Sequence, residues 1–366
     1  MKILFANDNL IGGGAEKLMN DLLPLINQEH RCDLLILTWE GEKYRDSLKK
    51  SGVKVRAVPE SIKTHLGKIK YVRAFIEHGN YDIVHANEFP MLYYCAIAGK
   101  LAKNKPLMIV TEHDTSNRRR NYRFARQLER FIYSKYKKIV SISPETQESI
   151  VKWLRPLDSR KFVTVYNGIP VRKFQNEIKY GRGDVFPKIT DDDILLCVVA
   201  SLTYKKNHSF MFDVMDKLPD RYKLILCGEG ELYDELNADV KRRGLSDRVV
   251  FLGFRSDVAS IMKTADIIVI PSKWEGFGLI SVEAMACERP IVCTDSPGMG
   301  AIIGDAGLKV RVDDCKGFVQ AIERLEDETL RSRLIDNCKS QCMKFDISKM
   351  KEGYLKVYED ALNGGG

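Results

Sequence analysis

The chain has 366 residues, more than one hydrophobic core usually organises, so its length predicts two domains. Hydrophobic residues form 44% and charged residues 30% of the composition, which is typical of a soluble globular protein. No run approaches the ~20 apolar residues that cross a bilayer, no secretory signal is visible, and the nine scattered cysteines form no C-x-x-C pair. We therefore expect a cytoplasmic protein with reduced thiols and exclude a disulfide scaffold.

The positive charge is concentrated in the first half of the chain. Residues 1–170 carry 29 basic and 18 acidic side chains, whereas the remainder carries 29 basic and 32 acidic side chains. Such an imbalance indicates that the N-terminal half meets an anionic partner.

Strand-like apolar runs alternate with amphipathic helical segments in two series, which is typical of parallel-sheet α/β domains. Residues 171–193 lack sustained periodicity and separate the two series as a linker would. We predict domains at 1–170 and 194–345, and a final helix and tail at 346–366. The predicted strands are residues 2–6, 33–38, 53–58, 83–85, 107–111, 138–142, 162–165, 194–200, 223–227, 249–252, 267–270 and 290–293.

Three glycines, Gly12, Gly13 and Gly14, follow the first predicted strand and precede a helix. The absence of Cβ atoms would let a ligand approach the backbone at the helix N-terminus. The spacing is not that of a dinucleotide-binding loop. A tight turn without a ligand explains the same residues, so both interpretations stay open here.

Two histidines end predicted strands of the first domain. His113 lies in Thr-Glu-His-Asp at residues 111–114, where a charged loop begins, and His85 ends the preceding strand. A single histidine is more often a hydrogen-bonded structural group than a functional one. For His113 the position favours function, whereas for His85 the two interpretations are balanced.

Residues 117–138 carry nine basic side chains, five aromatic ones and a single acid, Glu129. A solvated helix face usually mixes both signs of charge. The segment suits an anionic membrane surface or a lipid diphosphate, and a plain solvated helix is the alternative. No nucleic-acid-binding motif accompanies it, so nucleic acid is not an expected partner.

Loops after strands of the second domain hold further candidates. Ser201, Lys205 and Lys206 follow the first of these strands. Gly228 follows the next strand, and Phe254 and Arg255 follow the one after it. Glycine turns are common in any α/β domain, so this pattern alone also fits a purely structural role.

The most informative stretch is residues 272–286, Ser-Lys-Trp-Glu-Gly-Phe-Gly-Leu-Ile-Ser-Val-Glu-Ala-Met-Ala. An apolar strand and Pro271 lead into a glycine loop and then a helix, an arrangement that offers free amides to an anion. Glu275 lies in the loop and Glu283 lies in the helix. Carboxylates beside a phosphate commonly accept hydrogen bonds from sugar hydroxyls, so the pattern predicts a nucleotide-sugar site.

This Glu-x7-Glu motif resembles the signature of the retaining glycosyltransferases of family 4, and the resemblance extends over nearly the whole chain. It implies the GT-B fold, in which two Rossmann-like domains face each other across a cleft and a C-terminal helix crosses back to the N-terminal domain. It also implies that Glu275 and the backbone of Phe277, Gly278 and Leu279 hold the donor sugar. Glu283 would then bind the ribose.

The resemblance implies roles for the other loops as well. Lys206 would clamp the donor diphosphate, but Ser201 stands where the family usually has arginine, so Lys205 or Ser201 itself would have to compensate. His113 would approach the donor sugar. The remaining residues with an implied donor-side role are Gly13, Gly14, Gly228, Phe254 and Arg255.

We therefore expect a retaining glycosyltransferase that needs neither metal nor cofactor. A UDP-sugar is the expected donor, and a lipid-linked or surface-polysaccharide saccharide is the expected acceptor, met at the inner face of the membrane. The alternatives are a GT-B sugar-nucleotide epimerase, a glycoside hydrolase, and a binding protein without catalysis. The missing arginine favours the last of these.

Overall fold

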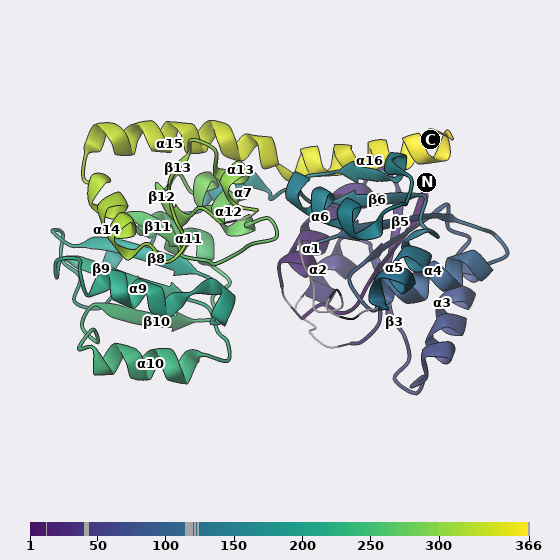
Figure 1. The fold of residues 1–366 in the computed structure, drawn as a ribbon, viewed down its shortest axis with the longest axis horizontal. Helices are drawn as coiled ribbons and strands as arrows, with labels where there is room; N and C mark the ends of the chain where they lie inside the picture. Colours follow the sequence, from purple (N-terminus) through teal and green to yellow (C-terminus); the bar gives the residue numbers. More distant parts are fainter. Residues whose placement is uncertain are drawn as a thin grey trace. The chain divides into compact units, whose positions relative to one another are not determined.

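The computed structural model describes residues 1–11, 13–39, 44–113, 120, 122, 124–296 and 298–364. The chain divides into two compact units (Figure 1). Unit 1 comprises Met1–Gly168 and Ile347–Gly366, and unit 2 comprises Ile169–Asp346.

Unit 1 is built on a seven-stranded parallel sheet in the order β3-β2-β1-β4-β5-β6-β7. The strands are β1 (Lys2–Asn7), β2 (Arg31–Ile36), β3 (Lys54–Ala57), β4 (Ile83–Asn87), β5 (Leu107–Glu112), β6 (Lys138–Ser141) and β7 (Phe162–Thr164). The helices are α1 (Gly14–Asn27), α2 (Arg45–Lys50), α3 (His65–Gly79), α4 (Met91–Leu101), α5 (Ala125–Tyr133), α6 (Pro144–Leu154) and α16 (Ile347–Leu362).

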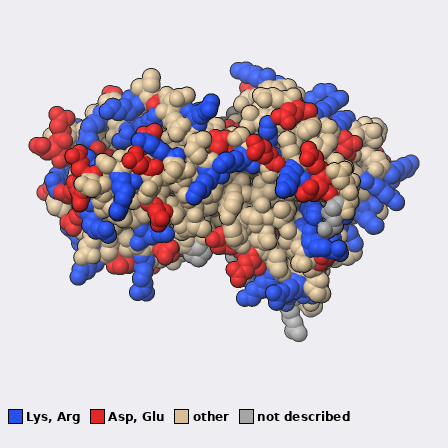
Figure 2. Space-filling view, turned by 90° about the horizontal axis from the view of Figure 1, so that it is seen from above, with Lys and Arg blue, Asp and Glu red and all other residues tan. Residues whose placement is uncertain are grey.

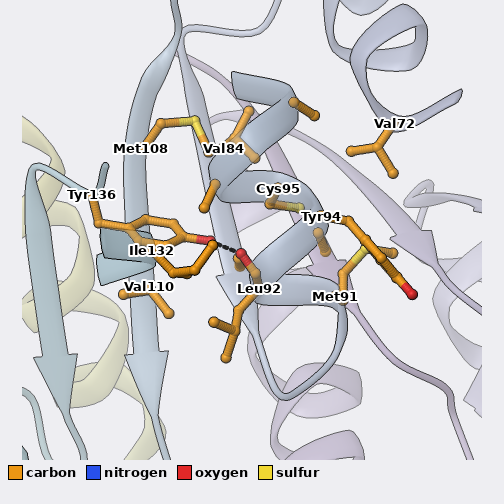
Figure 3. Packing of buried hydrophobic residues seen from close by; sticks show 14 of the residues in the cluster. Val72, Val84, Met91, Leu92, Tyr94, Cys95, Met108, Val110, Ile132 and Tyr136 are labelled. Carbon is orange, nitrogen blue, oxygen red and sulfur yellow. Dashed lines mark hydrogen bonds between the residues drawn. The ribbon is translucent and has the colours of Figure 1, made fainter. Parts of the chain in front are cut away.

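The core of unit 1 forms where α4 packs on the sheet (Figure 3). Strands with helices on both faces need continuous apolar runs, and the side chains of Ile3 to Ala6 in β1 are accordingly buried. Tyr136 donates its hydroxyl hydrogen to the carbonyl of Leu92, which satisfies a buried polar group at the edge of this core. Gly99 allows α4 to approach Met108, because a Cβ at this position would lie 2.3 Å from the Met108 sulfur.

The last helix, α16, belongs to unit 1 although it follows unit 2 in the chain. It packs against α1, and its Tyr358 hydroxyl lies 2.6 Å from Nδ1 of His85. The other ring nitrogen of His85 lies 2.7 Å from the hydroxyl of Thr111, which Tyr354 of α16 also contacts. His85 therefore has a packing role that joins two strands to the C-terminal helix.

Unit 2 contains a six-stranded parallel sheet in the order β10-β9-β8-β11-β12-β13. The strands are β8 (Ile194–Val199), β9 (Tyr222–Cys227), β10 (Val249–Gly253), β11 (Ile267–Ile270), β12 (Ile291–Thr294) and β13 (Gly307–Val310). The helices are α7 (Val171–Asn176), α8 (Arg182–Val185), α9 (His208–Met215), α10 (Tyr233–Arg242), α11 (Val258–Thr264), α12 (Leu279–Ala286), α13 (Gly300–Ile303), α14 (Cys315–Arg324) and α15 (Glu328–Cys342).

The predicted α/β class with two parallel Rossmann-like sheets is confirmed. Residues 171–193, expected to form a linker, instead contain α7 and α8 and lie within unit 2. The edge strand β13 is missing from the predicted series. Its exposed Lys309 and its initial glycine break the apolar run by which the other strands are recognised.

Candidate functional site

The carboxyl edge of the unit 2 sheet brings together two of the predicted catalytic residues. Strands β8 and β11 are neighbours, so the loops that follow them lie side by side. Lys206 ends a short 3₁₀ turn after β8, and Glu275 lies in the loop after β11. The Lys206 Nζ and Glu275 Oε1 atoms are 2.6 Å apart, and the two side chains are only 15% and 7% exposed. They form a charged pair that little water reaches.

Glycines determine the path of the Glu275 loop. Gly278 has φ 78°, a left-handed conformation that lets the loop turn directly into α12 at Leu279. Gly298, in the loop after β12, has φ 86° and lies against the backbone of Glu275. A Cβ at Gly298 would be 2.3 Å from the Glu275 carbonyl oxygen, so a larger residue would displace this loop.

The remaining members of the Glu-x7-Glu motif are buried. The Phe277 ring packs edge-on against Phe345, with centroids 5.6 Å apart, and so anchors the loop. Glu283 lies within α12 and is 5% exposed. The first amides of a helix have no carbonyl partner in a preceding turn, so the start of α12 at Leu279 can stabilise an anion.

The loops after β8, β9 and β10 pack closely around Ser201 and Gly228. The Gly228 amide donates to the Gly253 carbonyl at 2.8 Å, and a Cβ at Gly228 would lie 1.9 Å from the Ala200 carbonyl oxygen. Ser201 is exposed, and its carbonyl oxygen lies 3.0 Å from Nε2 of His208. The exposed Ser201 therefore brings no positive charge to this edge of the sheet.

Arg255 already has a carboxylate partner. Its Nε and Nη2 atoms lie 2.8 and 2.5 Å from the carboxylate oxygens of Asp257, which also accepts a hydrogen bond from the Tyr180 hydroxyl at 2.6 Å. The hydrogen bonds from Arg255 hold the pKa of Asp257 well below its usual range. The neighbouring Phe254 side chain is exposed, and its amide donates to Glu229 at 3.3 Å. Asp257 and Tyr180 were not predicted, since neither belongs to a motif.

In unit 1, Gly13 and Gly14 lie at the start of α1 and are exposed. The carboxylate of Glu16, three residues on, is buried and accepts hydrogen bonds from the amides of Gly13 and of Glu16 itself. Burial nevertheless raises the pKa of Glu16 above its ordinary value. Glu16 thus occupies amides that a ligand would otherwise use. Gly12 lies outside the described residues.

His113 lies at the carboxyl end of the unit 1 sheet. Its Nε2 atom lies 3.3 Å from Oδ1 of Asn87, the last residue of β4. Desolvation lowers the pKa of His113 to about 4, so the ring is neutral at pH 7. Asn87 was not predicted, because a single asparagine at a strand end carries no sequence signal. Asp114, the last residue of the Thr-Glu-His-Asp stretch, lies outside the described residues.

Both halves of the chain match models of known protein families. Residues 12–173 match the family model described as Glycosyltransferase Family 4. Residues 184–341 match the model described as Glycosyl transferases group 1. Together the two models account for most of both units. The chain belongs to the GT-B glycosyltransferases of group 1.

Relatives of this family member include transferases that act on lipid-linked saccharides. An N-acetylgalactosaminyltransferase from Campylobacter jejuni, whose name gives an N,N'-diacetylbacillosaminyl-diphospho-undecaprenol substrate, is 26% identical over 95% of this chain and 96% of its own. An Escherichia coli α-1,3-galactosyltransferase, named for UDP-Gal and a GlcNAc-diphosphoundecaprenol, is 26% identical over 77% of this chain and 76% of its own.

Among solved structures, Anabaena HepE in complex with UDP-glucose shares the fold. Its TM-score is 0.84 at 20% identity, covering 98% of this chain and 100% of the other. Within the described part of the chain, no helix is long and apolar enough to cross a membrane. Among those same residues, no group of three or more His, Cys, Asp or Glu is arranged to hold a metal ion.

Proposed function

We propose that this glycosyltransferase moves a sugar from a UDP-sugar to a hydroxyl of a lipid-linked saccharide, with retention at the anomeric carbon. The observation that carries the proposal is the Lys206–Glu275 pair beside the start of α12. Breaking the anomeric C–O bond builds negative charge on the leaving diphosphate. Lys206 and the first amides of α12 would stabilise that charge.

Glu275 has a second role in this proposal. Its carboxylate would accept hydrogen bonds from donor-sugar hydroxyls, while its contact with Lys206 keeps the ammonium oriented before the donor binds. Glu283 would bind the ribose hydroxyls from within α12. His113, neutral at pH 7, would offer an uncharged hydrogen-bonding group to the sugar. Gly228, Phe254 and Arg255, in loops of the same unit as Lys206, complete the proposed donor site there, whereas the amide of Gly13 is already bonded to Glu16.

The proposal includes metal independence, which Lys206 supports, and retention, which the resemblance to the family implies. Because Lys206 supplies the positive charge that a metal ion provides in other sugar transferases, a metal is not required for leaving-group stabilisation. The departing phosphate would accept the proton of the acceptor hydroxyl as that hydroxyl attacks from the same face. In this step the anomeric bond to the diphosphate breaks, a new glycosidic bond forms, and the proton moves to the phosphate.

We further propose that the segment 117–138 lies on an anionic membrane surface. Glu129, the single acid of this segment, is buried and accepts hydrogen bonds from Trp153 at 2.5 Å and Tyr93 at 3.1 Å. The outer side of α5 instead exposes Phe124, Leu128 and Phe131, which are spaced to form one stripe along the helix.

The burial of Glu129 leaves no exposed acid among the described residues of this segment, whereas the face in Figure 2 intermixes acidic and basic side chains. An apolar stripe among Arg and Lys matches the interface of an anionic bilayer, which supports the proposal that the enzyme works at the cytoplasmic face of the membrane. Residues 117–119, 121 and 123 lie outside the described residues. Sedimentation with phosphatidylglycerol vesicles tests this: Phe124→Ser with Phe131→Ser should reduce binding, and equal binding of both proteins would contradict it.

Calorimetric titration with UDP, GDP, ADP and their common sugar conjugates, with and without EDTA, tests the donor. Saturable binding of UDP that resists EDTA and is lost in Lys206→Ala would support the proposal. Binding of UDP-sugar without transfer to any acceptor would favour the binding protein that Ser201 suggests, and release of free sugar would favour an epimerase or hydrolase. The configuration of the product, read by NMR, decides between retention and inversion.

A further inference from the structure

In unit 2, the loop after β8 and the loop after β11 contact each other through a backbone hydrogen bond, an ion pair and a side-chain hydrogen bond. In the middle, the amide of Lys273 donates to the carbonyl of Lys205 at 2.8 Å. On one side of this backbone bond lies the shielded ion pair of Lys206 and Glu275. The residues that precede this pair, Tyr204 in one loop and Trp274 in the other, lie on the solvent side. The loops therefore present a charged inner face and an aromatic outer face.

The outer face is a pair of exposed aromatic rings. Tyr204 is 65% exposed and Trp274 is 45% exposed, although both belong to residue types that are usually mostly buried. Their ring centroids are 6.4 Å apart with planes at 56°, a tilted arrangement that leaves ring surface of both open. The Lys273 ammonium lies 4.3 Å from the Tyr204 ring centroid and 3.1 Å from its hydroxyl.

We propose that Tyr204 and Trp274 form a stacking platform for a pyranose ring. One face of a pyranose carries several C–H groups with partial positive charge, which complement the negative face of an aromatic ring. Its rim carries hydroxyls, for which the Tyr204 hydroxyl and the Lys273 ammonium, which lies over one face of the Tyr204 ring, provide hydrogen-bonding groups. Apolar ring surface bordered by a few polar groups is the composition expected of a site for such a ligand.

The position of the platform supports a saccharide ligand. Tyr204 and Trp274 each lie within two residues of a member of the Lys206–Glu275 pair, so a ring bound there is close to the proposed reaction centre. The inference rests on sugar transfer, which the family shares, and not on the identity of the nucleotide. Two sources supply a ring of this chemistry, the donor sugar and the acceptor glycan.

The experiment separates these sources with Tyr204→Ala, Trp274→Ala and the double variant. Calorimetry measures the affinity for UDP and for UDP-glucose, UDP-galactose and UDP-N-acetylglucosamine, and kinetics with a diphosphate-linked saccharide give the acceptor KM. If the platform binds the donor sugar, the sugar-dependent part of the affinity falls about tenfold while the affinity for UDP is unchanged. If it binds the acceptor, the acceptor KM rises about tenfold and donor affinity is unchanged.

Two controls keep the result interpretable. Tyr233→Ala removes a ring of matched exposure, 44%, from α10 of the same unit, and should leave all constants unchanged. Trp274→Phe keeps an aromatic face and should restore most of the loss seen in Trp274→Ala. Unchanged saccharide constants in the double variant would overturn the platform, as would failure of phenylalanine to restore binding. Should UDP itself not bind the wild type, the donor proposal fails, while methyl glycosides titrated directly still test the platform.

Discussion

The ammonium of Lys206 lies 2.6 Å from the carboxylate of Glu275, although 69 residues separate them in the chain. Adjacent parallel strands, β8 and β11, bring the two loops together. In a site that little water reaches, each charge depends on the other for its stabilisation. The lysine is therefore already oriented when a diphosphate arrives, and no ordering of its long side chain is needed at the chemical step.

Lys206 should matter mainly for catalysis. Its replacement should affect folding little once the charge of its partner, Glu275, is removed as well. Lys206→Ala alone should lower kcat/KM by about 10²–10³-fold and also destabilise the protein, because Glu275 is left as a buried unpaired charge. Lys206→Met combined with Glu275→Gln should recover most of the stability and stay inactive. Thermal unfolding and initial rates measure the two effects, with the exposed Lys309→Ala as the control. An active double variant would refute the assignment.

Glu283 should contribute to nucleotide affinity more than to turnover. Its carboxylate is buried in α12, and hydrogen bonds from ribose hydroxyls to a charged group contribute about 1.5–3 kcal/mol. Glu283→Ala should therefore weaken UDP binding about tenfold to a hundredfold, with a smaller change in kcat at saturating donor. Isothermal titration gives the first value. Glu323→Ala, an exposed acid on α14, should bind UDP as the wild type does, and equal affinity in Glu283→Ala would exclude the ribose role.

Gly298 should be required for two reasons: its backbone has a positive φ, and its missing Cβ leaves room for the backbone of Glu275. Gly298 and Gly244 both have positive φ, 86° and 71°, but only Gly298 has a backbone atom in the way of a Cβ. Gly244→Ala should cost only about 1–2 kcal/mol of stability from the left-handed conformation. Gly298→Ala should cost more and should also reduce transfer, since it displaces Glu275. Urea unfolding and activity assays compare the pair, and equal effects would argue against the contact.

Buried His85 should make stability depend on pH. Desolvation, and secondarily the charge of His113, lowers the pKa of His85 to about 3, whereas an unfolded histidine titrates near 6.5. Between these values the unfolded chain binds a proton that the folded chain does not. The stabilisation is therefore full above pH ~6.5 and is lost as the pH falls towards about 3.

His85→Gln removes this proton without removing hydrogen-bonding capacity towards Tyr358 and Thr111. Its free energy of unfolding should fall less steeply than that of the wild type between pH 6.5 and 5. Urea denaturation at several pH values supplies both slopes. Parallel slopes for the two proteins would show that His85 takes up its proton in the folded state too.

The fold could be predicted from the sequence because parallel strands that are buried on both faces appear as continuous runs of apolar residues. The strand from Ile267 to Ile270 and the helix from Ile347 to Leu362 both occur where the pattern indicates. Strand β13 was not predicted, because it lies at a sheet edge and is only partly buried. The helices within residues 171–193 escaped because short helices bury few residues and give little periodicity.

The site could be predicted only where a motif marks it. Glu275 and Lys206 were singled out, but their direct contact is a tertiary relationship that no spacing reveals. The partner of Arg255 lies two residues along the chain, yet acid–base spacing of this kind is too common to interpret. Asn87 lies beside His113 because neighbouring strands end together, which becomes evident only once the sheet order is known.

The return of the chain to unit 1 determines which part can finish folding first during synthesis. Ile169 and Asp346, the first and last residues of unit 2, are joined as a bridge, and the Ile169 amide donates to the Phe345 carbonyl at 3.0 Å. Unit 2 is thus one uninterrupted piece whose ends meet. Unit 1 must wait for α16, which is synthesised after all of unit 2, before Tyr358 can reach His85. A nascent chain that has emerged from the ribosome as far as residue 346 would hold a complete second unit and an unfinished first one.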